Sequence, residues 1–226
     1  MRMKLNAILL LVLSILLSFG AGCTDSGRFA VSGKASTLGF GGEFTTGVVS
    51  NINARVGFNT LDYDLDEQET DDIEYDFGLD FTSFTAMADW YVFDNSFRIS
   101  GGVLSMDHQI NLDSRATSEE TVEIGDDEYD WDQIGTLSGG IEIDQVAPYV
   151  GIGWGNPLAH NKRWGFTIDF GVAFISSPDV SLSADGALAS NPAFKANLAK
   201  EKANIEDDMD SFKYYPVIAL SLFYRF

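Results

Sequence analysis

The 226-residue sequence contains one cysteine, five prolines and two histidines, and it has few basic side chains. One cysteine excludes an internal disulfide bond. Its 14 Lys and Arg stand against 34 Asp and Glu, which gives a net charge of -20 and argues against nucleic acids and against basic docking to anionic lipid. Disorder is also excluded, because 45% of the residues are hydrophobic and 13% are aromatic.

Long apolar runs are absent after the first 22 residues. The chain begins with Arg2 and Lys4, continues through a leucine-rich run and reaches Gly20, Ala21 and Gly22. A basic start, an apolar run too short for a transmembrane helix and small residues at its end are typical of an export signal. We predict a signal peptide over 1–22 and one domain over 23–226.

The single cysteine, Cys23, directly follows this run. The sequence "GAGC" resembles the lipobox of bacterial lipoproteins, in which the cysteine becomes the acylated first residue, although Gly20 stands where that motif prefers leucine. Lipidation of Cys23 and ordinary cleavage nearby are both left open.

The remaining apolar stretches alternate with a period of two. In "WGFTIDFGVAF", residues 164–174, every second residue is large and apolar, whereas the residues between are small or polar. A tall apolar band on one strand face is what a membrane β-barrel requires, and the sheet must close because lipid offers no hydrogen bonds. The pattern predicts an all-β fold, an antiparallel transmembrane β-barrel.

Nine segments follow this pattern: 30–44, 51–65, 75–91, 97–112, 134–143, 146–154, 164–176, 180–185 and 214–226. The connections "TTGVVSN", "VFDNS", "DQ" and "SSPD" are short, and the others are mostly longer and charged, as in barrels whose short turns face the periplasm. Even strand numbers are the rule, so eight and ten strands are both left open. Pro192 after Asn191, followed by apolar residues at helical spacing, predicts a short helix in the last long loop.

The last strand ends the chain on a bare phenylalanine. Its alternate apolar residues resemble the signal that the barrel-assembly machinery reads in outer-membrane proteins: Ile218, Leu220, Leu222, Tyr224 and Phe226. A lipid-facing strand needs no polar tail, because lipid surrounds it.

The resemblance extends over nearly all of the mature chain. The segments "VSGKASTLGFGGEF", "VAPYVGIGWGNP", "GFTIDFGVAF" and "PVIALSLFYRF" resemble a family of small outer-membrane β-barrels of Gram-negative bacteria, similar in style to OmpA-type membrane domains. This resemblance implies a bacterial outer-membrane location. It implies no activity and no cofactor.

The residues that alternate with the large apolar ones are expected to face the lumen, and they include charged side chains of both signs. We predict an ion-pair cluster that plugs the half of the barrel near the short turns, because buried charges persist only when paired. A narrow ion-conducting pore is the alternative. The predicted cluster contains Glu43, Arg55, Asp89, Arg98, Glu142, Asp169 and Arg225.

Catalytic residues are not predicted. A surface hydrolase would need a histidine paired with serine or aspartate. His108 has the parity of Leu104 and Met106, which predicts an outward orientation, and His160 lies in a charged loop.

Acidic segments are the other candidate for function. "DYDLDEQETDDIEYD" begins like a calcium loop but lacks the glycine and the closing glutamate of an EF-hand. A solvated loop is one interpretation, and divalent cations shared with lipopolysaccharide are the other. We therefore predict a monomeric outer-membrane protein with a structural or surface-interaction role and possible cation-binding loops at Asp62, Asp64, Asp66, Asp71, Asp72, Asp126 and Asp127.

Overall fold

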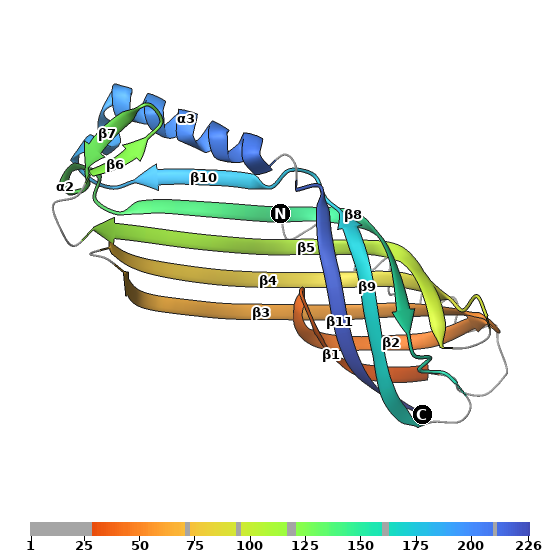
Figure 1. The fold of residues 1–226 in the computed structure, drawn as a ribbon. Coiled ribbons are helices and arrows are strands. Elements are labelled where there is room, and N and C mark those ends of the chain that lie inside the picture. Colours follow the sequence, from red (N-terminus) through yellow and green to blue (C-terminus); the bar gives the residue numbers. More distant parts are fainter. Residues whose placement is uncertain (1–28, 71–72, 94–95, 117–120, 160–162, 210–211) are drawn as a thin grey trace.

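The computed structural model describes residues 29–70, 73–93, 96–116, 121–159, 163–209 and 212–226. Eight antiparallel strands close into a ring in the order β8-β5-β4-β3-β2-β1-β11-β9, with β8 paired to β9 (Figure 1). The ring strands are β1 Phe29–Ser36, β2 Gly39–Val49, β3 Ile52–Thr70, β4 Ile73–Trp90, β5 Phe97–Ala116, β8 Leu137–Trp154, β9 Trp164–Phe174 and β11 Tyr214–Arg225.

The first hairpin corrects the prediction of one strand over 30–44. The chain turns at Thr37 and Leu38, and Ser36 pairs with Gly39 across the turn. Gly39 has a φ of 101°, and a Cβ there would lie 2.4 Å from the carbonyl oxygen of Thr60. Only glycine fits such a backbone next to β3.

Two further corrections give the count of eight. The predicted turn "DQ" does not exist, because β8 runs unbroken through Asp144 and Gln145. The segment 180–185 is also no separate ring strand. It corresponds to β10 (Asp179–Ala184), which pairs with β8 beyond the end of β9, so β9 and β10 share one neighbour.

Both described ends of the chain lie on one rim, which we call the terminus rim. The connections that follow β2, β4 and β8 start from the same rim. The opposite rim carries the turn at Thr37, and the connections that follow β3, β5 and β9 lie on the same side of the ring. The connection after β8, predicted among the long loops, therefore begins and ends on the terminus rim, and the described residues 66–70 of the predicted loop "DEQETDD" all belong to β3.

The outside of the ring is an apolar belt. The alternating row of β9 faces outward, as the sequence predicts: Trp164, Phe166, Ile168, Phe170 and Phe174 are exposed and Val172 is half-buried, and the alternate residues of β11 from Ile218 to Phe226 are exposed as well. On β5 the outward row starts at Phe97 and meets its first carboxylate at Asp107. Ten residue steps of roughly 3.3 Å on a strand tilted by about 40° span about 25 Å, the height of the apolar band of outer-membrane barrels.

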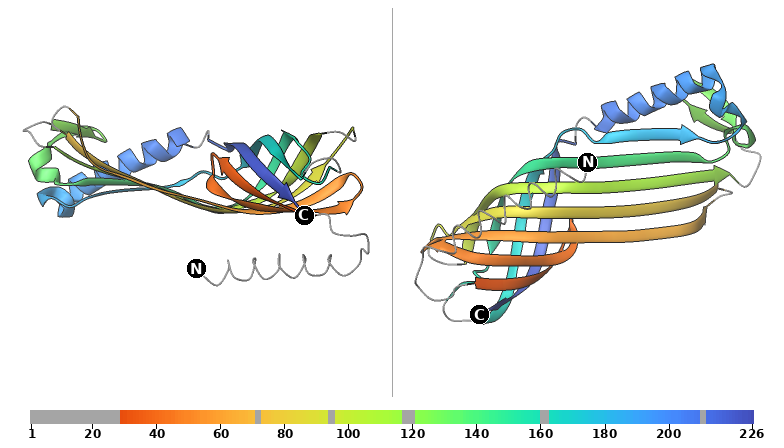
Figure 2. Two further views of the ribbon diagram at one scale, coloured as in Figure 1. Left: turned by 90° about the horizontal axis from the view of Figure 1, so that it is seen from below. Right: turned by 180° about the vertical axis from the view of Figure 1, so that it is seen from behind.

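Five strands continue past the ring as a single sheet layer, which we call the extension: β3 from Leu61, β4 up to Phe81, β5 from His108, β8 up to Gln145, and β10 (Figures 1 and 2). The outer face of the extension lies on the same side of the strands as the apolar belt of the ring, but its side chains are polar. One row of paired residues across it is Asp62, Asp80, Gln109, Glu142 and Asp179.

The inner face of the extension continues the lumen wall and is apolar. One row of paired residues across it is Tyr63, Leu79, Ile110, Ile141 and Val180. The polarity of the two faces therefore inverts where the sheet leaves the ring, as expected of strands that pass from lipid into water.

A small subdomain sits at the tip of the extension. It consists of β6 (Thr121–Ile124), β7 (Asp127–Asp130), α2 (Trp131–Ile134), η1 (Ala187–Ser190) and α3 (Pro192–Met209). The predicted helix in the last long loop is α3, and Asn191 caps it by accepting a hydrogen bond from the amide of Ala193 at 2.9 Å. Phe194 packs with Ile124, Trp131 and Ile134 in a buried cluster. The helix then runs beside β10 (Figure 1).

Over the described residues, none of the helices combines the length and the apolar character needed to cross a membrane. The predicted signal peptide 1–22 and Cys23 lie outside the described residues, as do His160, Asp71 and Asp72.

Candidate functional site in the barrel lumen

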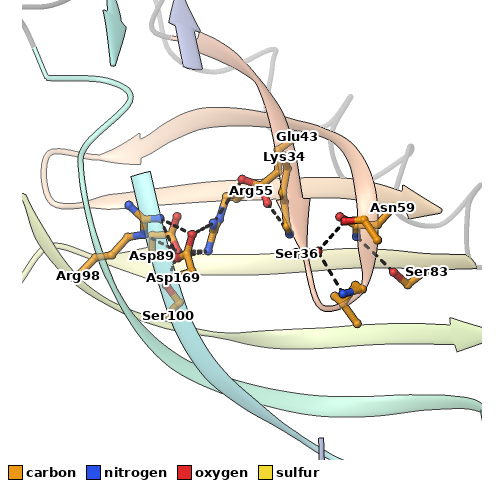
Figure 3. Close-up of polar contacts among 12 residues, drawn as sticks. Lys34, Ser36, Glu43, Arg55, Asn59, Ser83, Asp89, Arg98, Ser100 and Asp169 are labelled. Atoms are coloured by element: carbon orange, nitrogen blue, oxygen red, sulfur yellow. Dashed lines mark hydrogen bonds and ion pairs between the residues drawn. The ribbon is translucent and has the colours of Figure 1, made fainter. Parts of the chain in front are cut away.

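Six ring strands place one charged side chain each at a common level of the lumen, and we call this set the ionic cluster. It consists of Lys34 from β1, Glu43 from β2, Arg55 from β3, Asp89 from β4, Arg98 from β5 and Asp169 from β9 (Figure 3). The side chains alternate with outward residues along each strand, so strand geometry alone directs them inward.

Asp169 lies between the two arginines. Arg98 donates to both of its carboxylate oxygens, at 2.7 and 2.9 Å, and Arg55 donates to it at 3.2 Å. Both of these contacts come from one guanidinium nitrogen, Nη2, and hydrogen bonds between ionised partners are shorter and stronger than neutral ones. Arg98 also donates to the carbonyl oxygen of Gly155, which joins the cluster to the terminus rim.

Arg55 connects the two halves of the cluster. It donates to Asp89 at 3.0 Å and to Glu43 at 3.3 Å, and Lys34 reaches Glu43 at 3.1 Å. Asp89 also accepts a hydrogen bond of 2.6 Å from the hydroxyl group of Ser100. The contacts form one connected network across the lumen.

The network is buried and electrically balanced. The six charged side chains are between 1% and 6% exposed. Its three cations match its three carboxylates, which is the condition under which charges can remain ionised away from bulk water. A cavity of about 10 Å³ borders Lys34, Arg55, Thr85 and Asp169. This volume accommodates about one water molecule.

A second, apolar layer fills the lumen between the ionic cluster and the extension. It consists of Leu38, Leu104, Met106, Ala147, Tyr149, Ala173, Ile175 and Val217. Tyr149 occupies the space left by two glycines on neighbouring strands, since a Cβ on Gly151 or Gly171 would lie 2.4 or 2.3 Å from its hydroxyl oxygen. The ring is therefore filled by two layers of opposite character.

The structure brings five of the seven predicted cluster residues together and adds one that the sequence analysis missed. Lys34 was missed because the unrecognised turn at Thr37 reverses which parity faces inward. With that turn in place, Lys34 pairs opposite Gly41, two residues from Glu43 on the inward face of β2. The sequence signal that could have indicated Lys34 as a cluster member is a lysine opposite a glycine and next to a buried acid.

The other two predicted members lie elsewhere. Glu142 is exposed on the outer face of the extension, where it pairs with Asp179. Its orientation was predicted wrongly because large apolar residues were taken to face lipid, and this rule reverses beyond the belt. Arg225 is near the terminus rim, where it donates to the carbonyl oxygens of Leu158 and Ala159.

The predicted outward orientation of His108 is wrong for the same reason. His108 is 2% exposed, stacks on Phe81 with ring centroids 4.4 Å apart and meets Tyr215 edge-on at 5.7 Å. Neither ring nitrogen has a hydrogen-bond partner within the described parts of the chain. The neighbouring residue Asp107 is exposed on the outer face.

The described acidic residues of the predicted loops lie in strands or contact α3. Asp62 and Asp64 are exposed on β3, and Asp66 belongs to the same strand. Asp126 forms an ion pair with Lys200, and Asp127 accepts a hydrogen bond of 2.7 Å from Asn197, so both bind α3. In the described ranges no group of three or more acids, histidines or cysteines could hold a metal ion, and shared cation binding stays a prediction.

The closed ring, the apolar belt and the filled lumen define the class of fold: a small outer-membrane β-barrel. Solved structures agree. Over 90% of this chain and all of the other, CarO2 of Acinetobacter baumannii superimposes with a TM-score of 0.64 at 20% identity. CarO of the same organism has a TM-score of 0.61 at 18% identity, over 87% of this chain and 97% of the other. No family model matches the sequence, and no curated protein sequence matches it significantly.

Proposed function

We propose that the chain is an outer-membrane protein whose barrel is a closed anchor, and that its role is to present the extension at the cell surface. The terminus rim would face the periplasm, where the short turns of such barrels lie. The carboxylates of the outer face would then begin just outside the outer leaflet.

The observation that carries this proposal is the balanced ionic cluster beneath a layer of apolar side chains. An ion entering from the extension would first leave water for the layer around Met106 and Tyr149. It would then have to break pairs such as Arg98–Asp169 in a region of low dielectric constant. In an eight-stranded barrel, side chains are enough to fill the interior.

Planar bilayer recording tests the closed anchor. We expect no steady unitary conductance from the refolded protein. A variant with Arg55→Ala and Tyr149→Ala removes one large side chain from each layer, and it should conduct if these layers are the barrier. Steady conductance steps from the unmodified protein would contradict the proposal and would favour a narrow porin.

A further inference from the structure

The inner face of the extension is an apolar surface that the rest of the described chain covers only in part. The tip subdomain packs on Leu137 and Ala184 at its far end. Closer to the ring, Tyr63 remains 48% exposed and Leu112 42% exposed. We propose that this face binds a cationic amphipathic polypeptide from outside the cell. The inference rests on the proposed function, because it requires the extension to be extracellular.

The apolar character of the face is continuous. Three successive rows of paired residues cross it, and within them the described chain has no lysine, arginine, aspartate or glutamate. His108 and Val180 are buried within these rows, whereas the other members are half-buried or exposed, and an open apolar area of this kind on a soluble surface marks an interaction site. The rows are Leu61, Phe81, His108 and Ile143; Tyr63, Leu79, Ile110, Ile141 and Val180; and Leu65, Phe77, Leu112, Gly139 and Leu182.

The shape of the face favours a polypeptide over a small molecule. The four strands β3, β4, β5 and β8, spaced at roughly 4.8 Å, give an open width of about 14 Å, since Val180 of β10 is buried. Three rows on alternate residues add about 14 Å along the strands. A helix with a diameter of about 10 Å could lie across such a surface with one side buried. Amphipathic helices bind to apolar surfaces in this manner.

The charges around the face select the sign of the partner. Asp62 and Asp64 are exposed on the outer face of β3, at the free edge where the two faces of the sheet meet. On the opposite side, α3 runs beside β10, and its last turn carries the exposed Asp207 and no basic residue, while Glu206 pairs with Lys202 at 3.4 Å. A partner with an apolar centre and cationic flanks matches this arrangement. A second copy of this chain, with a net charge of -20, and an anionic lipid would both be repelled.

Fluorescence anisotropy with a labelled probe peptide tests the proposal. The full protein would be placed in nanodiscs of zwitterionic lipid, and the probe would be a synthetic peptide of leucine and lysine at helical spacing. Empty nanodiscs give the background. We expect saturable binding that weakens as the salt concentration rises, since the attraction of the charged flanks is screened. A peptide with glutamate in place of lysine should not bind.

Matched variants locate the site. Leu79→Ser and Leu112→Ser remove apolar area from the inner face of β4 and β5, and together they should weaken binding about tenfold, the effect of about 1.4 kcal/mol. Gln109→Ser makes a change of comparable size on the outer face of β5 and should leave affinity unchanged. Electrophoretic mobility without heating would verify that each variant has folded.

Each remaining outcome overturns the inference. Equal binding of the glutamate peptide, or affinity that both inner-face changes leave intact, would remove the site. Dimers that dissociate in the double variant would assign the face to a second copy instead. Failure of this inference is distinguishable from failure of the proposed function, because the bilayer recordings depend on Arg55 and Tyr149 and not on Leu79 or Leu112.

Discussion

At the residue scale, Asp169 occupies the position of greatest electrostatic consequence. It accepts hydrogen bonds from Arg55 and Arg98 and is buried with them. Such networks stabilise little compared with well-packed apolar residues, but the loss of one partner leaves an unpaired charge without water. The ionic cluster therefore makes the fold sensitive to single substitutions.

Asp169→Asn should lower the free energy of unfolding by about 3–5 kcal/mol, because it leaves one excess positive charge between two arginines. Urea titration in lipid vesicles, followed by tryptophan fluorescence, measures the change. Asp144→Asn is the control: this acid is exposed on the outer face, and the same substitution should change stability by less than about 0.5 kcal/mol. Equal effects at the two sites would show that the cluster is accessible to water.

His108 offers a second test at this scale. Its ring nitrogens lack partners, yet its ring stacks on Phe81. His108→Phe keeps the stacking and removes the two unsatisfied polar atoms, so stability should rise by about 1 kcal/mol. The same urea titration gives the result. A loss of stability would mean that the imidazole makes hydrogen bonds that the described chain does not supply.

At the element scale, glycines set how closely neighbouring strands approach. A Cβ on Gly41 of β2 would lie 1.9 Å from the carbonyl oxygen of Phe58, whereas Gly33 of β1 has no heavy atom within 4 Å of the same position. Two glycines in one hairpin therefore have opposite tolerance for a side chain.

Gly41→Ala should reduce the yield of folded barrel sharply, since backbone atoms of β3 cannot move away without breaking the ladder. Gly33→Ala should fold normally, with stability unchanged or slightly higher because the unfolded chain loses freedom. The fraction that migrates as folded protein in unheated gels compares the two. Normal folding of Gly41→Ala would require β2 and β3 to be farther apart than the structure shows.

Strand elements were predictable where outward residues are large. The row from Trp164 to Phe174 shows its period directly, and β9 has the predicted orientation. The first hairpin was not predictable in this way, because Gly33 and Ala35 face outward and give no contrast with the inward residues. The sequence predicted which side chains face the interior of the ring better than it predicted which face is apolar in the extension. Ile141 and Glu142 exchange faces there as the surroundings change from lipid to water.

At the scale of the whole molecule, the unequal strand lengths leave β3 with a free edge. β2 pairs with β3 only up to Thr60, so among the described residues the outer part of β3 has no paired strand on that side. The opposite edge strand, β10, is accompanied by α3. Free edges invite pairing with other chains, and charged side chains are a common protection. The acids of β3, predicted as a solvated loop, are placed to act in this way.

Replacing Asp62 and Asp64 together by threonine should promote self-association, because the edge would become neutral and rich in β-branched residues. Light scattering coupled to size exclusion in detergent would detect the larger species. The same pair of changes at Asp80 and Asp107 lies where β4 and β5 are paired on both sides and should leave the size distribution unchanged. Equal aggregation of both variants would point to lost net charge instead of the edge.

The inversion of polarity above the belt also determines how deeply the barrel is embedded in the bilayer. Asp107 and Asp144 pair side by side on the outward face, directly above the last apolar positions. In a thicker bilayer this pair would be drawn into hydrocarbon, and in a thinner one the aromatic rings near the terminus rim would emerge into water. The two carboxylates thus mark the boundary between hydrocarbon and water, and they match the barrel to one membrane thickness.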